Sequence, residues 1–205
     1  MSRCSQTSTI RRLALWCAVC AWVAASATHG SAVPQRPQTA GSAGVTPRYD
    51  GSRNLVLPEG YRQWVLVGTS LGLSYADGGG GHQMFHATLM EPTAYRHFVE
   101  TGEFRDGTMF ALLLQGIGAN VLPARQGQFA TDVHAVEMAV KDASRVPEGW
   151  AYYDFGGSMS GGAQPSAAPQ PKNRCYDCHL EHAARDHVFT QFYGLLNEAA
   201  SGVRR

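Results

Sequence analysis

Two cysteines and a histidine near the C-terminus of this 205-residue chain form a Cys-x-x-Cys-His motif: Cys175, Cys178 and His179. One helical turn sets two thiols about as far apart as the two vinyl groups of a porphyrin, and the adjacent imidazole can reach the iron. The motif therefore predicts one covalently attached haem c, bound through Cys175 and Cys178, with His179 as an iron ligand.

Two other interpretations of the motif stay open. A zinc site could use Cys175, Cys178, His182 and His187, but a Cys₂His₂ finger needs about a dozen residues between its second Cys and its first His. Only three residues separate Cys178 from His182. A redox-active dithiol would lie early in a βαβ unit, whereas this motif lies near the C-terminus. The spacing favours haem over both alternatives.

The N-terminus has the pattern of an export signal. Two arginines precede an apolar run over residues 13–25, and small residues follow. This pattern predicts a signal peptide over residues 1–32, cleaved after Ala27 or Ala32, rather than an uncleaved anchor helix. No later stretch is apolar enough for a membrane helix, so we expect a periplasmic protein that does not span the membrane after processing.

Removal of residues 1–32 changes both the cysteine count and the charge. Only Cys175 and Cys178 of the five cysteines would remain, which excludes a disulfide framework and predicts a fold held by its core. The removed segment has three basic and no acidic residues, so the formal charge falls from +1 to −2. This charge disfavours nucleic acid as a partner.

The remaining chain is expected to hold one folded domain. Residues 33–53 are rich in Pro, Gly, Ser and Thr and predict a disordered lead-in, followed by a haem domain over residues 54–205. Five apolar runs between Gly-rich breaks predict strands. These runs are 64–75, 84–90, 108–114, 133–140 and 150–155, and the third is apolar enough to be central.

One short helix is expected over residues 91–99, because Pro92 suits an early helical position and apolar residues follow at helical spacing. The helix should end near Gly102. The Gly78–Gly81 run predicts a hairpin loop, since no phosphate-binding signature follows it. The Gly, Ser and Pro content of residues 156–171 predicts a flexible connection to the motif.

The fourth strand run has an alternating pattern. One face would carry Val136, Met138 and Val140, and the other Glu137, Ala139 and Lys141, which is typical of a half-buried strand. The predicted fold class is therefore mainly β, of the α+β type. It has an antiparallel sheet, one or two short helices and a C-terminal haem-binding helix.

The position of the motif bears on the kind of cytochrome. Small electron-carrying cytochromes c place the motif near the N-terminus and take a Met ligand from far downstream, yet residues 180–205 contain no Met. The four-helix cytochromes c′ do place it near the C-terminus, but five strand runs contradict a helical bundle. A β-rich scaffold with a C-terminal haem is needed.

The order of these motifs resembles the cytochrome P-460 family, which includes the β-sheet cytochromes c′. Besides the haem motif, the resemblance rests on Tyr61-Arg-x-Trp64, Pro92-x-Ala-Tyr95, Gly102 with Asp106-Gly-Thr108, Val136-Glu137 through Trp150-Ala-Tyr-Tyr-Asp-Phe155, and Asp186 with Val188-Phe189. The resemblance implies an antiparallel β fold, a homodimer, and one haem with an open axial position.

The resemblance also implies a small ligand such as nitric oxide or hydroxylamine, which the protein would bind or convert. One alternative is a hydroxylamine-oxidising enzyme, a haem-dependent oxidoreductase in which a lysine is cross-linked to the porphyrin. The lysines left after processing are Lys141 and Lys172, and a solvated Lys141 is the simpler interpretation. The other alternative is a periplasmic electron carrier with a redox partner protein.

Overall fold

The structure is a computed structural model that describes residues 44–51, 53–73 and 83–202. The predicted signal peptide and the predicted Gly78–Gly81 loop lie outside these residues, as does the end of the first predicted strand. Within the described ranges, no helix combines the length and apolar character that a membrane crossing needs.

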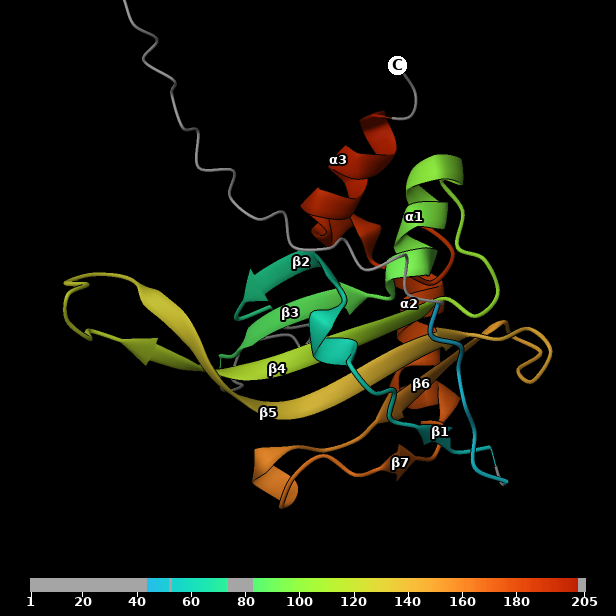
Figure 1. The fold of residues 1–205 in the computed structure, drawn as a ribbon, viewed down its shortest axis with the longest axis horizontal. Coiled ribbons are helices and arrows are strands. Elements are labelled where there is room, and N and C mark those ends of the chain that lie inside the picture. The colour runs from blue at the N-terminus through green and yellow to red at the C-terminus, as the bar shows by residue number, and fades with distance from the viewer. Residues whose placement is uncertain (1–43, 52, 74–82, 203–205) are drawn as a thin grey trace, which may run out of the picture. The chain divides into compact units, whose positions relative to one another are not determined.

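A five-stranded antiparallel sheet forms the centre of the fold (Figure 1). Its order is β2 (Val65–Leu71), β3 (Phe85–Met90), β4 (Met109–Ala119), β5 (Gln128–Lys141) and β6 (Trp150–Asp154). Each strand overlaps one predicted apolar run, and β4 is central. The predicted fold class is confirmed.

Short elements complete the chain. A second, two-stranded sheet pairs β1 (Leu55–Val56) with β7 (Ser166–Ala167). The α-helices are α1 (Pro92–Thr101), α2 (Tyr176–His182) and α3 (Gly194–Gly202), and the 3₁₀ turns are η1 (Tyr61–Gln63), η2 (Ser158–Ser160), η3 (Lys172–Arg174) and η4 (Thr190–Phe192). The motif therefore lies on the second of the α-helices.

Helix α1 forms where the sequence predicts it. The buried carboxylate of Glu91 accepts a hydrogen bond from the Ala94 backbone N–H at 2.8 Å and so caps the N-terminus. Pro92 occupies the first turn, where a missing N–H has no cost. The helix ends at Gly102, whose φ of 75° places it in the left-handed region that glycine adopts without strain.

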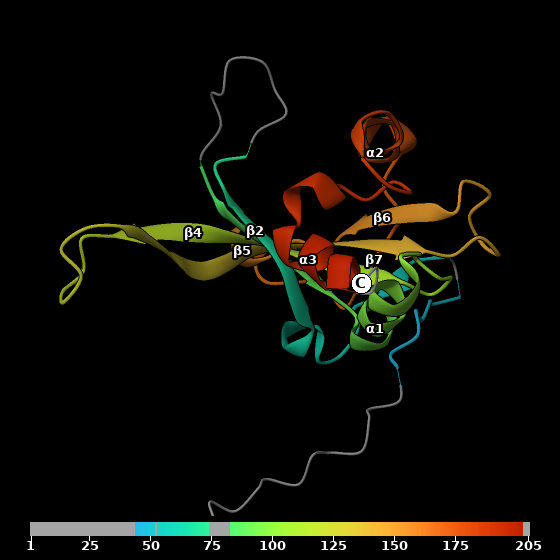
Figure 2. The same cartoon turned by 90° about the horizontal axis from the view of Figure 1, so that it is seen from above.

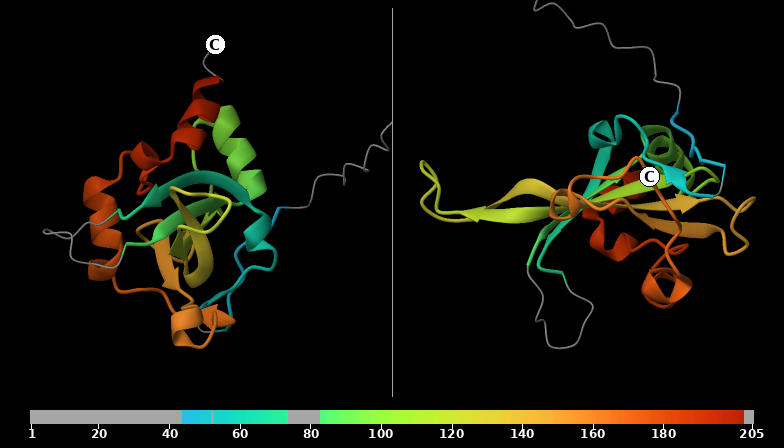
Figure 3. Two further views of the ribbon diagram at one scale, coloured as in Figure 1. Left: turned by 90° about the vertical axis from the view of Figure 1, so that its left-hand side faces the viewer. Right: turned by 90° about the horizontal axis from the view of Figure 1, so that it is seen from below.

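The sheet separates two apolar cores. Residues 136, 138 and 140 of β5 belong to the first core, together with β1, β7 and η1, which confirms the predicted alternation. The second core joins the opposite face of the sheet to α1, α3 and Val188. Helix α2 lies on the other side of the sheet from β1 and η1 (Figures 2 and 3). Other elements therefore pack against both faces of the central strands.

The connection over residues 156–171 is ordered, so the prediction of flexibility was wrong. β7 within it pairs antiparallel with β1, and the Gln170 backbone N–H donates to the Tyr152 carbonyl at 2.7 Å. Glycines 156, 161 and 162 have φ of 67°, 84° and 114°, which lets the chain turn back and pair its backbone. Backbone hydrogen bonds thus replace the apolar side chains that this segment lacks.

Part of the predicted lead-in contacts the domain. The Tyr49 hydroxyl donates to Asp142 at 3.0 Å, and the Val45 backbone N–H donates to Glu91 at 3.3 Å. The boundaries at residues 32 and 53 stay predictions.

Strands β4 and β5 continue past the other strands as a projecting hairpin (Figures 1 and 3). Two register irregularities, after Leu114 and after Gln115, separate this hairpin from the regular pairing below it. No residue between 117 and 130 belongs to either described core. The projecting hairpin therefore adds no residue to either described core.

Helix α3 offers a matched test of the second core. Leu196 is fully buried there, whereas its neighbour Leu195 is 51% exposed. Leu196→Ala should lower the free energy of unfolding by about 2–5 kcal/mol, because it removes buried methyl groups and leaves a cavity. Leu195→Ala should change it by about 0.5 kcal/mol or less. Urea unfolding of both variants checks this, and equal losses would contradict the assignment of α3 to the core.

Candidate haem-binding site

The motif lies on α2 and its first residue caps that helix. Cys175 stands at the N-cap, and its carbonyl accepts a hydrogen bond from the His179 backbone N–H at 3.1 Å. Cys178 follows one turn later. Both thiols are free and only partly exposed. The helix thus presents two thiols and an imidazole from one turn and a half of backbone, as the spacing predicts.

The His179 ring is held in one tautomer. Its Nδ1 lies 2.7 Å from the His187 carbonyl oxygen. A carbonyl can only accept, so Nδ1 carries the proton and Nε2 keeps a lone pair. Burial lowers the pKa of His179 and favours the neutral ring, against the raising effect of this hydrogen bond. The ring also packs against Tyr152 and Phe189, with centroids 4.3 and 4.4 Å away.

A cavity lies between the motif and the sheet. Its lining comes from β3, β4, β5 and β6, from the segment leading into α2, and from the C-terminal segment: Thr88, Phe110, Leu112, Glu137, Met138, Ala139, Tyr152, Tyr153, Asp154, Gln170, Arg174, Cys175, His179 and Tyr193. The motif's first cysteine and its histidine therefore border the same space.

The pairing register of the sheet builds the floor of this cavity. Residues that face each other across adjacent strands form rows, and alternate rows point to the same side. One row is Thr88, Leu112, Glu137 and Asp154, and the next on that side is Phe110, Ala139 and Tyr152. A third row, Lys141 and Trp150, follows on the same side. The face predicted to be polar is thus the face of the site.

Glu137 is an acidic group on this floor. Desolvation by burial is the main cause that raises its pKa, and the facing Asp154 raises it further, while Arg174 acts in the opposite direction. A carboxyl in this environment is protonated more readily than one in water. It can therefore hold or release a proton inside the cavity.

Two tyrosines close the apolar part of the cavity. Burial raises the pKa of Tyr193 and of Tyr152, so both hydroxyls stay protonated. The Tyr152 hydroxyl donates to the His187 carbonyl at 3.2 Å, the same oxygen that His179 uses. Tyr152 therefore belongs both to the cavity wall and to the surroundings of the motif histidine.

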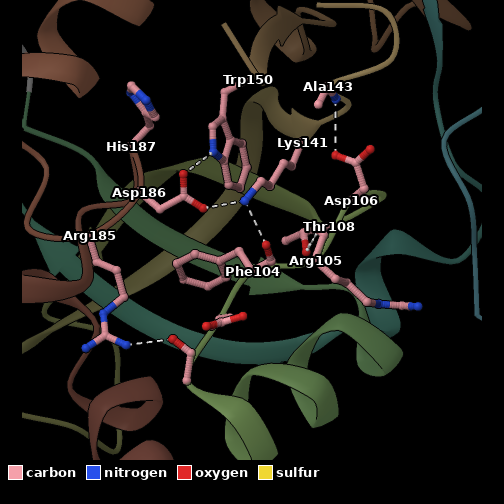
Figure 4. A network of polar contacts seen from close by, with 12 residues as sticks. Phe104, Arg105, Asp106, Thr108, Lys141, Ala143, Trp150, Arg185, Asp186 and His187 are labelled. Carbon is pink, nitrogen blue, oxygen red and sulfur yellow. Dashed lines mark hydrogen bonds and ion pairs between the residues drawn. The ribbon is translucent and has the colours of Figure 1, made fainter.

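Both described lysines are paired outside the cavity. The Lys141 ammonium donates to the Phe104 carbonyl at 2.8 Å and to Asp186 at 2.7 Å (Figure 4), and its side chain is 23% exposed. The expectation of a solvated Lys141 was wrong, because β5 brings this side chain under the turn that contains Asp186. Lys172 pairs with Glu148. Neither lysine lines the cavity.

The zinc interpretation gains no support. Among the residues that the structure describes, no three or more His, Cys, Asp and Glu side chains gather as a metal site would require. His182 is exposed on α2 and lies 3.7 Å from Glu181. The His187 ring stacks on Tyr176, with centroids 5.0 Å apart, and its buried Nδ1 makes no hydrogen bond within the described part of the chain.

The comparison with known families decides the family. A sequence model of the family described as Cytochrome P460 matches residues 58–190, more than half of the chain. This chain belongs to the cytochrome P460 family. The match contains the whole motif and every lining residue of the cavity except Tyr193. No curated protein matches the chain. Membership of the cytochrome P460 family implies a haem cofactor.

The residues present fit a haem. A neutral imidazole with a free nitrogen suits iron, and the free thiol of Cys175 shares the cavity with the apolar residues Phe110, Leu112 and Ala139, which suits a porphyrin. Sequence reasoning identified the cysteines and the histidine. It did not identify Tyr152 or the His187 carbonyl, because contacts across the sheet leave no local signal. It placed Glu137 only on the polar face of a strand, and an acidic residue between apolar strand neighbours is the signal that could have identified it.

The pKa of Glu137 leads to a pH-dependent prediction. Folding raises this pKa above its ordinary value of 4.5, so ionisation of the carboxyl destabilises the fold as the pH rises above that value. Glu137→Gln should therefore raise the free energy of unfolding relative to wild type at about pH 7 and change it little at about pH 4. Urea unfolding at both pH values measures the difference.

The control for this measurement is Glu103→Gln, which changes an exposed carboxylate in the same way. It should show no such pH dependence. If Glu137→Gln is less stable than wild type at neutral pH, the partly buried carboxylate does not destabilise the fold and this prediction is wrong.

Proposed function

We propose that this protein is an exported cytochrome with one haem c, attached through Cys175 and Cys178 and ligated by His179. A small nitrogen oxide, such as nitric oxide or hydroxylamine, would occupy the open axial position and be bound or slowly converted. The single observation that carries this proposal is the cavity that Cys175 and His179 share with the apolar rows of the sheet. Homodimer formation and a redox partner stay predictions.

An open axial position is supported by what lines the cavity. Of the described histidines, His179 alone lines it. The side chain of the lining residue Met138 belongs to the first core, on the opposite face of the sheet. Among the described residues, the cavity therefore offers no second His or Met ligand, and a small molecule can take that place.

The chain's own groups can handle one proton beside such a molecule. Bound haem would supply the Lewis acid and the redox centre. The Glu137 carboxyl, with its raised pKa, can accept a proton from hydroxylamine or return one to a bound ligand. Phe110, Leu112 and Ala139 line the cavity with apolar surface and so disfavour water there.

The positions of the lysines support ligand binding over rapid hydroxylamine oxidation. In the family that this chain resembles, hydroxylamine oxidation is associated with a lysine cross-linked to the porphyrin. Lys141 is engaged by Asp186 and Phe104, and Lys172 by Glu148, and neither lines the cavity. A cross-link would need one of these pairs to break.

Covalent attachment is the first consequence to test. Haem should stay with the wild-type polypeptide in a denaturing gel, because thioether bonds survive denaturation and non-covalent ligation does not. Replacing both cysteines, Cys175→Ala with Cys178→Ala, should abolish that signal. His182→Ala, which would remove a zinc ligand, should leave the signal unchanged. Covalent haem in the double mutant would overturn the proposed attachment.

The open position is the second consequence. The ferrous protein should be five-coordinate and should bind nitric oxide without displacing a protein ligand, as seen in its optical spectrum. Anaerobic incubation with hydroxylamine and an electron acceptor should give no sustained turnover, and haem should map to the peptide with residues 175–179 alone. Sustained turnover that is lost in Lys141→Ala would instead identify Lys141 as a cross-linking residue.

A further inference from the structure

The turn after α2 has an unusual backbone. Asp186 and His187 are successive non-glycine residues with φ of 42° and 59°. Arg185 and Val188 flank them and exchange backbone hydrogen bonds, with the Val188 N–H donating at 2.8 Å. Two positive φ values at the centre of such a turn normally call for Asn-Gly or Gly-Gly. A conformation of this kind persists only where surrounding contacts hold it.

Asp186 makes the contacts that hold this turn. Its Oδ2 accepts from the Lys141 ammonium at 2.7 Å, and its Oδ1 accepts from the Trp150 indole N–H at 3.1 Å (Figure 4). Trp150 is almost fully buried. It faces Lys141 directly across β5 and β6, so one row of the sheet supplies both donors. The turn is therefore fixed to the rigid part of the fold.

One carbonyl of this turn accepts a hydrogen bond from the motif histidine. The carbonyl of His187 accepts the Nδ1–H of His179 at 2.7 Å and the Tyr152 hydroxyl at 3.2 Å. The direction of this carbonyl depends on the backbone angles of the turn. A second partner of a metal-bound histidine fixes its ring orientation and raises its electron donation to the metal.

We propose that Asp186, anchored by Lys141 and Trp150, is a positioning residue for His179. It holds the His187 carbonyl against Nδ1 and so sets the orientation and the basicity of the ring. The inference rests on the proposed function, in which His179 ligates haem iron. It gives Lys141 a role that needs no bond to the porphyrin: the lysine anchors the turn behind the iron ligand.

Lys141→Met provides the decisive test, because two explanations predict opposite signs. Loss of a nearby positive charge by itself stabilises the ferric form and lowers the reduction potential of the haem. Loss of the anchor weakens the hydrogen bond at Nδ1, so His179 donates less and the potential rises. We expect a rise equal to about a tenfold change in the ferric–ferrous equilibrium, or about 59 mV for one electron.

Three variants complete the experiment on the haem-loaded protein. Lys172→Met, the same change at the other described lysine, should lower the potential or leave it unchanged. Lys141→Arg keeps the positive charge and the hydrogen-bond donors, so the reduction potential of the haem should stay close to that of wild type. Asp186→Asn keeps a residue that tolerates positive φ but weakens the anchor, and should lower the iron–histidine stretching frequency of the ferrous protein.

The outcomes separate this inference from the proposed function. A wild-type protein without covalent haem, or without an iron–histidine stretch that disappears in His179→Ala, would overturn the proposed function. With both present, a potential that falls in Lys141→Met would overturn the positioning role. If Lys141→Met does not fold, an unchanged stretching frequency in Asp186→Asn overturns it instead, because charge loss alone does not alter the ring's hydrogen bond.

Discussion

The register between β4, β5 and β6 is the constraint on which the rest of this structure depends. Side chains alternate between the faces of a strand, so the pairing decides which residues meet on each side. With the observed register, Val136, Met138 and Val140 fill one core, while Glu137, Ala139 and Lys141 lie toward the helices. A slip of one residue would exchange these two sets. The cavity and the structural core are thus specified by the same backbone hydrogen bonds.

The helical side of the sheet carries polar groups, and the surroundings of each limit the free-energy cost of burying it. Lys141 and Asp186 compensate each other, and Trp150 satisfies the second carboxylate oxygen. No described residue forms an ion pair with Glu137, and burial raises the pKa of its carboxyl. The row of Lys141 and Trp150 is therefore neutralised by pairing, whereas in the row of Glu137 burial raises the pKa of the carboxyl. The difference matters, since only a group that changes protonation can exchange a proton with a ligand.

Much of the fold could be predicted because its signals are local. The five strand runs, helix α1 with Pro92 and Gly102, and the Cys-x-x-Cys-His motif can each be recognised from adjacent residues. What failed depends on partners far away in the sequence. The turn at Asp186 and His187 contains no glycine, so no local signal predicts it. It is held because Trp150 and Lys141, which lie 36 and 45 positions earlier in the sequence, bind the Asp186 side chain. Residues 156–171 look flexible because their order comes from backbone pairing with β1.

The irregular pairing after Leu114 divides the long β4–β5 ribbon into two parts with different freedom to change. Below it, most residues of β4 and β5 pack in a core or line the cavity, so an inserted residue would shift a whole row. Above it, the described residues 117–130 support neither core, and exposed side chains such as Val121 and Leu122 gather near the tip. Loop tips of this kind tolerate insertions. Among descendants of this gene, the hairpin is the segment whose length can drift while the chemistry of the site is inherited intact.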